Sequence, residues 1–201
     1  MIAILDYGSG NLRSAQRAFE TSGREVVITS DYQVALNADG LVVPGVGAFA
    51  ACMNGLNAVD GAAIVRERLA KERPTLGICI GMQILFSQGT EHSESAAHAG
   101  VGIWDGIISK LDAPILPHMG WNTVYFKKDS AMNTGVSTNP RYYFVHSYFV
   151  DCANQDDILC TTQYGQEFVS GFQTLLCQWR SHLLTFSGLW ESIKRSAYKN
   201  V

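Results

Sequence analysis

Short apolar runs and helical patterns alternate along the first eighty residues of the chain. After the apolar residues 2–5, Leu12, Ala15 and Phe19 recur at the spacing of one helix face. A helical pattern covers about residues 62–71, and further apolar runs lie at residues 25–29, 40–45 and 75–78. The run at 75–78 lacks polar alternation, which is typical of a strand covered on both faces. This order predicts a parallel, doubly wound α/β sheet.

The pattern changes after Gly102, where short β-rich segments follow one another without helices between them. They are residues 102–108, 122–126, 141–148, 157–162 and 167–172. We expect mixed and antiparallel strands here, a polar surface loop at residues 87–100, and a helix-like piece from about Ser187. No linker or repeat interrupts the pattern, so we expect one domain over residues 1–201.

The composition agrees with a single well-buried domain and excludes several classes of partner. The 201 residues are 47% hydrophobic and carry a net charge of -3, with lysine and arginine scattered along the chain. Such a charge distribution argues against nucleic-acid and membrane-surface binding. There is no basic leader and no run of about 18 apolar residues, so we expect a cytoplasmic protein.

The chain has five cysteines, which are Cys52, Cys79, Cys152, Cys160 and Cys177. Their odd number and wide spacing, without a CxxC pair, favour reduced thiols over a disulfide framework or a zinc site. We expect neither a metal nor a cofactor. A reducing compartment would keep a catalytic thiol intact.

Cys79 lies where the apolar run 75–78 meets a helical pattern, between Gly77 and Gly81. A sharp strand-to-helix turn exposes its central residue at the carboxyl edge of a sheet, and glycines tolerate the crowded backbone. A helix beginning near Gly81 would direct amides at the sulfur and lower the pKa of the thiol. The pattern indicates a nucleophile; the alternative is a small buried cysteine that fills core space.

The turn after the third apolar run can supply the amide donors that attack on a carbonyl requires. Gly45 and Gly47 allow the backbone to turn its N–H groups inward. Val46 or Gly47, together with Ile80, are the candidate oxyanion donors. Taken alone, the same glycines would form an ordinary turn at the end of a strand.

Five segments occur in the order found in one known family. They are DYGSGNLRS, LVVPGVGAF, LGICIGMQILF, PHMGWN and YYFVHSY. From Met1 to about Phe172 the chain resembles the glutaminase subunits of imidazole glycerol phosphate synthase, which are class I (triad) glutamine amidotransferases. The resemblance implies a flavodoxin-like α/β domain with a parallel central sheet and additional mixed or antiparallel strands.

The resemblance also implies an activity and a partner. Glutamine would be hydrolysed through a cysteine thioester on Cys79. The ammonia would pass to a (β/α)8-barrel cyclase subunit, and this heterodimer would make imidazole glycerol phosphate and AICAR in histidine biosynthesis.

The resemblance further places a glutamine site around Gln83, the backbone of His146, Ser147 and Tyr148, and Gly45. Gln83 lies one helical turn beyond Cys79, where its amide could bond the α-carboxylate or the amine of an amino acid. The alternatives are an exposed helix glutamine for Gln83 and a satisfied core imidazole for His146.

By the same resemblance, residues 117–122 lie towards the barrel. Met119, Trp121 and Asn122 are the candidate interface residues, because aromatic residues and methionine are enriched in interface cores. The alternative is a loop folded back on its own core.

The C-terminal part departs from the family from about Gln173. The family ends its last strand with glutamine, an aromatic residue and His-Pro-Glu, in which the histidine is the base and the glutamate orients it. If Gln178 and Trp179 match that motif, Arg180 stands at the base position and His182 at the glutamate position. Arginine cannot act as a base near neutral pH. His182 is a candidate substitute, although it would lie about 6 to 7 Å from that position.

Three hypotheses follow. The first is an ammonia-generating glutaminase subunit, and the second is a catalytically impaired subunit that still docks on the barrel. The third is a different cysteine hydrolase on a flavodoxin-like sheet, which would have no use for the PHMGWN segment. The clustered loss of turn, base and carboxylate also predicts a shift of reading frame near Gln173.

Overall fold

The computed structural model describes residues 1–93, 96–152, 154–175 and 182–186, with the backbone alone for residues 152, 174–175 and 182–186. Its helical elements are α1 Leu12–Glu20, α2 Tyr32–Asn37, α3 Phe49–Ala58, α4 Gly61–Ala70, the single turn α5 Ile80–Gln83 and the 3-10 turn η1 Gln155–Asp157. Its first strands are β1 Ile2–Leu5, β2 Val26–Thr29, β3 Gly40–Gly45, β4 Thr75–Cys79, β5 Phe86–Gly89, β6 His98–Ala99 and β7 Trp104–Lys110. The later strands are β8 His118–Thr123, β9 Tyr125–Phe126, β10 Arg141–His146, β11 Tyr148–Cys152, β12 Ile158–Tyr164, β13 Gln166–Leu175 and β14 His182–Phe186.

The main sheet has a parallel half and a mixed half. Its strand order is β2-β1-β3-β4-β14-β13-β11-β7-β5-β6; in addition, β12 pairs with β13, and β9 pairs with β12. The strands from β2 to β14 pair in parallel, whereas β14 with β13, β13 with β11 and β11 with β7 are antiparallel pairs. The predicted α/β fold, with a parallel sheet extended by mixed strands, is confirmed.

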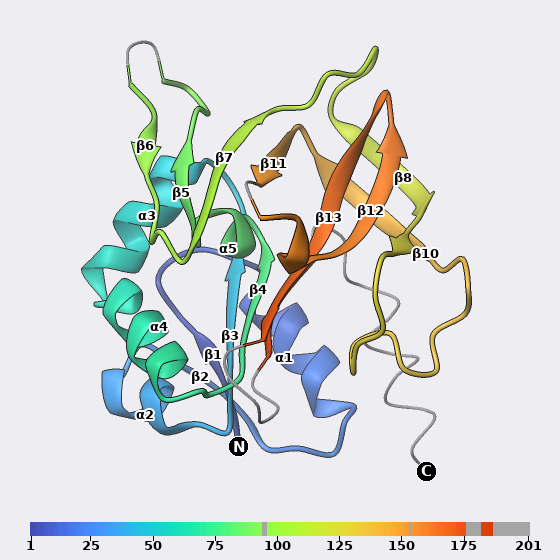
Figure 1. Cartoon of the computed structure of the whole chain (residues 1–201). Helices are drawn as coiled ribbons and strands as arrows, with labels where there is room; N and C mark the ends of the chain where they lie inside the picture. Colours follow the sequence, from blue (N-terminus) through green and yellow to red (C-terminus); the bar gives the residue numbers. More distant parts are fainter. Residues whose placement is uncertain (94–95, 153, 176–181, 187–201) are drawn as a thin grey trace.

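Alternation along β1 explains the layers seen in Figure 1. Successive side chains of a strand point to opposite faces. Ala3 and Leu5 pack in a cluster that includes residues of α2, α3 and α4, whereas Ile4 packs with Ala15 of α1. The sheet is therefore covered on both faces, and the carboxyl ends of β3 and β4 lie at the edge where parallel α/β sheets bind ligands.

A second, two-stranded sheet lies beside β12 and β13 at the upper right of Figure 1. It consists of β8 and β10, which pair antiparallel from Thr123 with Arg141 to His118 with His146. Tyr142 and Phe144 point from β10 into a separate apolar cluster that contains Leu159, Cys160 and Phe168. This part of the chain therefore has its own small core.

Buried Arg68 holds the other end of the parallel strands together. Its side chain is fully buried, and its guanidinium donates to the carbonyl oxygens of Ala35, Leu36 and Ala38 at 2.8–2.9 Å and of Pro74 at 2.7 Å. Burial lowers the pKa of Arg68 to about 10, so the group keeps its charge at neutral pH. Arg68 thereby ties α2 and α4 to the start of β4.

Several expectations from the sequence need correction. The segment 87–100 is not simply a loop, because β5 and β6 lie within it, and PHMGWN is mostly strand β8. The helix expected after Cys79 is one turn long, and α2 and α3 were not predicted. The helix-like piece from about Ser187 lies outside the described residues. Across the described ranges, no helix is both long and apolar enough to span a membrane.

Candidate active site

Cys79 is the last residue of β4 and adopts a backbone conformation that is rare for a non-glycine residue. Its φ is +57° and its ψ is -120°. Holding such a conformation costs on the order of 1–3 kcal/mol, so the surrounding structure must enforce it. The predicted sharp turn is present, and the Cys79 side chain is partly accessible, whereas Cys52 and Cys160 are buried.

The glycines around Cys79 allow backbone segments to touch. A Cβ on Gly81 would lie 1.9 Å from the Val43 carbonyl oxygen, and one on Gly45 would lie 2.4 Å from the Gly81 nitrogen. Strand pairing sets Gly45 directly beside Cys79. The glycine-rich turn and the Cys79 turn therefore lie against each other at the same sheet edge, as the sequence predicted.

The expectation of a lowered thiol pKa is wrong for this structure. Burial raises the pKa of Cys79, and the hydrogen bond from the Ile80 amide to the sulfur only partly offsets this effect. A single helical turn offers a weaker dipole than the helix that the sequence suggested. Cys79 is therefore a thiol at neutral pH, and its attack on a carbonyl would require a base to take the proton.

The two candidate oxyanion donors in the glycine-rich turn differ in their surroundings. The Val46 N–H donates to the Ser9 hydroxyl at 3.1 Å, and that hydroxyl donates to the Val46 carbonyl oxygen at 2.8 Å. Ser9 therefore holds both polar groups of Val46. Gly47 has a φ of +101°, which glycine adopts without strain. Within this turn, the Gly47 amide is therefore the better candidate to donate to an oxyanion, and the donor roles of Gly47 and Ile80 stay predictions.

Gln83 is 1% exposed, so the alternative of an exposed helix glutamine is wrong. Its Nε2 donates to the Tyr148 carbonyl oxygen at 3.2 Å. Its Oε1 is buried and has no hydrogen-bond partner among the described residues. A buried acceptor without a partner is costly unless a ligand donates to it. The arrangement therefore favours the ammonium group of an amino acid over its carboxylate as the partner of Gln83.

The imidazole of His146 is satisfied by protein atoms. Its Nε2 lies 2.9 Å from His118 Nδ1, and its Nδ1 lies 3.0 Å from the Tyr148 carbonyl oxygen. This is the core imidazole that the sequence left as an alternative. Next to it, the carbonyl of Ser147 accepts from the Leu111 amide at 2.9 Å. The predicted substrate contacts of this backbone segment stay a prediction.

Burial lowers the pKa of His118 to about 4, from an ordinary value of 6.5, and this predicts a pH-dependent stability. As pH falls below 6.5, the unfolded chain takes up a proton before the folded chain does. The contribution of neutral His118 is therefore complete above that pH and is lost as pH falls towards 4. One proton corresponds to a slope of about 1.4 kcal/mol per pH unit.

Urea unfolding of the wild type and two variants between about pH 6.5 and pH 5 measures this slope. His118→Gln should reduce it, because one of the two buried imidazoles with a lowered pKa is removed. His92→Gln is the comparison variant, since its side chain is 79% exposed, and the slope should be smaller in His118→Gln than in His92→Gln. Equal slopes in the wild type and His118→Gln would contradict the prediction.

Glu91 is a residue of this region that the sequence analysis missed. Its carboxylate accepts from the Phe49 amide at 2.8 Å, and its side chain is 14% exposed. Burial is the main reason that the pKa values of Tyr148 and Cys52 are raised, and the charge of Glu91 adds to the rise. A carboxylate near Tyr148 would suit the ammonium group that Gln83 favours. In the sequence, Glu91 is a single acidic residue eight positions after Gln83, within a segment that resembles an ordinary polar loop, so nothing there indicated a site.

The position of β14 contradicts the suggestion that His182 is a substitute base. Leu183 pairs with Thr75 and Phe186 pairs with Ile78, so His182 lies at the start of β14, level with Pro74. That level is five residues from Cys79, or about 16 Å along a strand. His182 is therefore at the opposite end of the sheet and cannot be the substitute base. The residues matched to the family motif, 178–181, lie outside the described residues.

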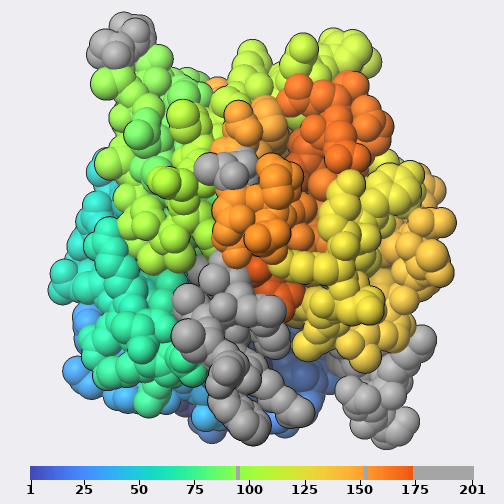
Figure 2. Space-filling model, in the orientation of Figure 1, coloured from blue at the N-terminus to red at the C-terminus, as the bar shows by residue number. Residues whose placement is uncertain are grey.

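The solvent-exposed side of β8 and β10 carries an apolar patch, which we call the outer face. Its members are Met119 (60% exposed), Trp121 (46%), Tyr143 (41%) and Val145 (51%). The rings of Trp121 and Tyr143 meet edge to face at 5.7 Å. The alternative of a loop folded on its own core is thus wrong. Asn122 belongs to the same strand, but its amide donates to the Gln163 carbonyl oxygen at 2.9 Å. The segments around β10 form the right side of Figure 2.

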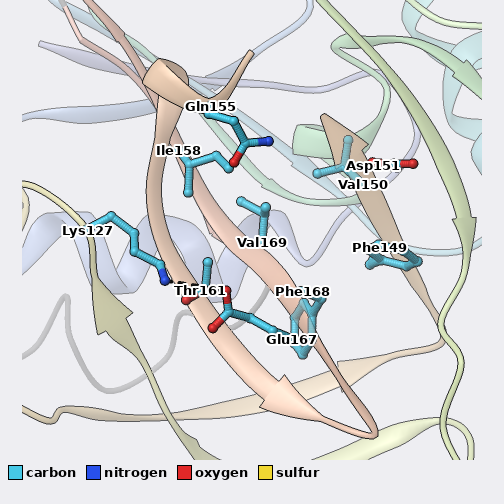
Figure 3. A pocket seen from close by; sticks show the side chains of 10 residues that line it. All are labelled: Lys127, Phe149, Val150, Asp151, Gln155, Ile158, Thr161, Glu167, Phe168 and Val169. Atoms are coloured by element: carbon cyan, nitrogen blue, oxygen red, sulfur yellow. Dashed lines mark hydrogen bonds and ion pairs between the residues drawn. The ribbon is translucent and has the colours of Figure 1, made fainter. Parts of the chain in front are cut away.

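A cavity of about 370 Å³ lies elsewhere, between β11 and the β12–β13 pair (Figure 3). Lys127 and Glu167 approach each other there at 3.4 Å. Among the described residues that line it there is no candidate site residue, no cysteine and no histidine. We therefore place the candidate active site at Cys79.

A known protein family and several of its members match this chain over most of its length. The profile of the class-I glutamine amidotransferases matches residues 3–174, so the match ends where the departure was predicted. The chain is 59% identical over 149 residues to the imidazole glycerol phosphate synthase subunit HisH of Corynebacterium diphtheriae, covering 74% of this chain and 70% of that protein. It is 54% identical over 174 residues to the same-named protein of Mycobacterium tuberculosis, covering 86% and 84%.

Solved structures agree on the fold at lower identity. A glutamine amidotransferase crystal structure superposes with a TM-score of 0.71 at 13% identity, covering 98% of this chain and 97% of that one. A CTPS glutaminase domain of Trypanosoma brucei with bound acivicin gives a TM-score of 0.67 at 17% identity, covering 100% and 94%.

Proposed function

Because the chain belongs to the class-I glutamine amidotransferase family, we propose that it is the glutamine-binding subunit of an imidazole glycerol phosphate synthase in histidine biosynthesis. In this function the ammonia of glutamine passes to a (β/α)8-barrel cyclase subunit. The observation that carries the proposal is the turn at Cys79, with its positive φ, beside Gly45 and within one helical turn of buried Gln83. The relatives' name supplies the synthase to which the proposed subunit belongs.

The proposed chemistry follows from a thiol beside amide donors. The Cys79 sulfur attacks the side-chain carbonyl of glutamine, and its proton passes to a base. The tetrahedral oxyanion accepts from the Gly47 and Ile80 amides, and the leaving nitrogen takes a proton and departs as ammonia. Water then hydrolyses the thioester to glutamate and restores the thiol.

Substrate binding is proposed to use the buried groups around Gln83. The side-chain oxygen Oε1 of Gln83 accepts from the α-ammonium group, which the Glu91 carboxylate also attracts. The backbone at Ser147 and Tyr148 lines the same site. These groups place the reacting carbonyl near Cys79 without taking part in bond breaking.

A second candidate function is a docking subunit with impaired glutaminase activity. It is favoured by the register of β14, which sets His182 far from Cys79, and by the raised pKa of the thiol. A different cysteine hydrolase is disfavoured, because it would have no use for the exposed apolar outer face.

We expect a glutamine analogue with an electrophile at the side-chain carbonyl to label Cys79 selectively. Cys79 is partly accessible, whereas Cys52 and Cys160 are buried, so neither of these two thiols should compete. Mass spectrometry of peptides from the labelled chain locates the adduct. Cys79→Ser should lose the label, whereas Cys52→Ser should keep it. Labelling of all cysteines to the same extent would contradict the proposal.

We expect Trp121→Ala to weaken binding to the barrel subunit by about 2 kcal/mol, or roughly 30-fold. Trp121 lies on the outer face and stacks edge to face on Tyr143, as an interface anchor would. Titration calorimetry measures the affinity. Val34→Ala, an exposed apolar residue on α2, is the control and should bind normally. Unchanged affinity of Trp121→Ala would move the interface elsewhere.

A further inference from the structure

Two buried histidines link strand β8 to Gln83 through a continuous series of hydrogen bonds. Asn122 Nδ2 lies 3.4 Å from His118 Nε2, and His118 Nδ1 lies 2.9 Å from His146 Nε2. His146 Nδ1 lies 3.0 Å from the Tyr148 carbonyl oxygen, which also accepts from Gln83 Nε2 at 3.2 Å. The series therefore begins on β8 and ends one helical turn from Cys79.

Elementary hydrogen-bond chemistry fixes the direction of every link. A carbonyl oxygen can only accept, so His146 carries its hydrogen on Nδ1. A neutral imidazole has one N–H, so His146 Nε2 must accept from His118 Nδ1. His118 Nε2 is then an acceptor for the Asn122 amide. Both histidines are thus Nδ1–H tautomers.

The surroundings keep both rings neutral. His118 is 2% exposed and His146 is 7% exposed. Phe144, Tyr164 and Phe168 surround them, and the rings of His118 and Tyr164 stack at 3.8 Å. A proton added to His146 Nε2 would set two N–H groups against each other across 2.9 Å, and one added to His118 Nε2 would face the Asn122 amide N–H at 3.4 Å. Burial accordingly lowers the pKa of both groups.

We propose that the His118–His146 pair is a positioning device that couples docking on the outer face to the orientation of Gln83. His118 and Met119 are adjacent in β8 and point to opposite faces, so a partner that shifts Met119 and Trp121 also shifts His118. The shift reaches the Tyr148 carbonyl through His146. Because the Tyr148 carbonyl holds Gln83 Nε2, it determines where the side-chain oxygen Oε1 of Gln83 points. The inference rests on the proposed role of Gln83 in holding glutamine.

The wild-type protein provides the first test. Nitrogen-15 NMR of histidine-labelled protein at about pH 7 should show two neutral Nδ1–H imidazoles, assigned by His118→Gln and His146→Gln. An Nε2–H tautomer or a charged ring at either position would overturn the proposal. If either variant fails to fold, the assignment follows instead from nuclear Overhauser contacts to the Tyr164 and Phe168 rings.

The second test uses labelling of Cys79 by the electrophilic glutamine analogue. His146→Phe keeps a ring but removes both nitrogens, and it should raise the half-saturating analogue concentration about 10-fold while the limiting labelling rate stays unchanged. The double variant Gln83→Ala/His146→Phe should behave like Gln83→Ala alone, because the pair acts through Gln83. Additive effects, or unchanged half-saturation in His146→Phe, would refute the coupling.

Partner dependence separates the coupling from a purely structural role. Adding the barrel subunit should change the half-saturating analogue concentration of the wild type, and this change should vanish in His146→Phe. If His146→Phe does not fold, His118→Phe breaks the same series one link earlier and should reduce the change by half or more. A change retained in the variant that is used would refute the coupling. Failure of the wild type to label at Cys79 would instead refute the proposed function.

Discussion

Complexes of this chain with the barrel subunit should make product from ammonia but should use glutamine at least about 1,000-fold more slowly than complexes with an intact relative. The reason is the proton on Cys79. Burial keeps the thiol protonated, and the described residues place no histidine beside it to act as base. Removing the base of a catalytic triad typically costs several orders of magnitude in rate.

The measurement compares product formation with glutamine and with ammonium salts, using the Mycobacterium tuberculosis relative as the intact subunit. Cys79→Ala sets the baseline for the glutamine reaction. His182→Ala should match the wild type, because His182 lies at the far end of the sheet. Near-normal glutamine turnover would reveal a base that the described residues do not include, and loss of that turnover in His182→Ala would show that the register of β14 is wrong.

The encoding DNA offers an independent observation. Translation of the other two frames beyond the Gln173 codon should give a strand followed by His-Pro-Glu, if a frame shift explains why the family match ends at residue 174. Absence of that motif from both frames would mean that the C-terminal sequence is genuine. The slow glutamine reaction would then be a property of the natural subunit.

Gly81→Ala should destabilise the protein by about 3 kcal/mol, or roughly 150-fold in the ratio of folded to unfolded chain. The new Cβ would lie 1.9 Å from the Val43 carbonyl oxygen and 2.9 Å from the Pro44 carbonyl carbon, which are backbone atoms held within the sheet. Relief requires β3 and the Cys79 turn to separate. Labelling of Cys79 should therefore be lost even in the fraction that stays folded.

Chemical unfolding and analogue labelling measure both effects. Gly23→Ala is the matched control, because Gly23 has a φ of +72° but no atom within 4 Å of the added Cβ. Its cost should be that of backbone strain alone, on the order of 1–2 kcal/mol. Equal stability losses in the two variants, with labelling retained in Gly81→Ala, would show that the contact between the two turns is dispensable.

The sequence predicted the parallel strands well, because each is a short apolar run with a distinct boundary. Residues 40–45 coincide with β3, and the run before Cys79 extends into β4 as expected. The placement of Gly45 beside Cys79 was also predictable, since parallel strands end at one edge. These features depend on local pattern and on a general rule of sheet geometry.

Other features depend on tertiary context that no local pattern contains. The outer face looks like a loop in the sequence because Pro117 and Gly120 interrupt it, and its apolar residues face solvent. The pKa of Cys79 rises because of burial, which a motif does not encode. The pairing of His118 with His146 requires the register of two strands that are far apart in the chain.

The position of β14 has a consequence for biosynthesis. β4 and β13 are neighbours in the sheet only through β14, which lies between them and is translated after both. Until residue 186 has left the ribosome, the strand that ends in Cys79 and the long strand β13 each present an open edge. Open edges in the middle of a half-made sheet invite pairing with other chains. The nascent chain is thus most exposed to aggregation between the synthesis of β13 and that of β14, when a chaperone would protect it best.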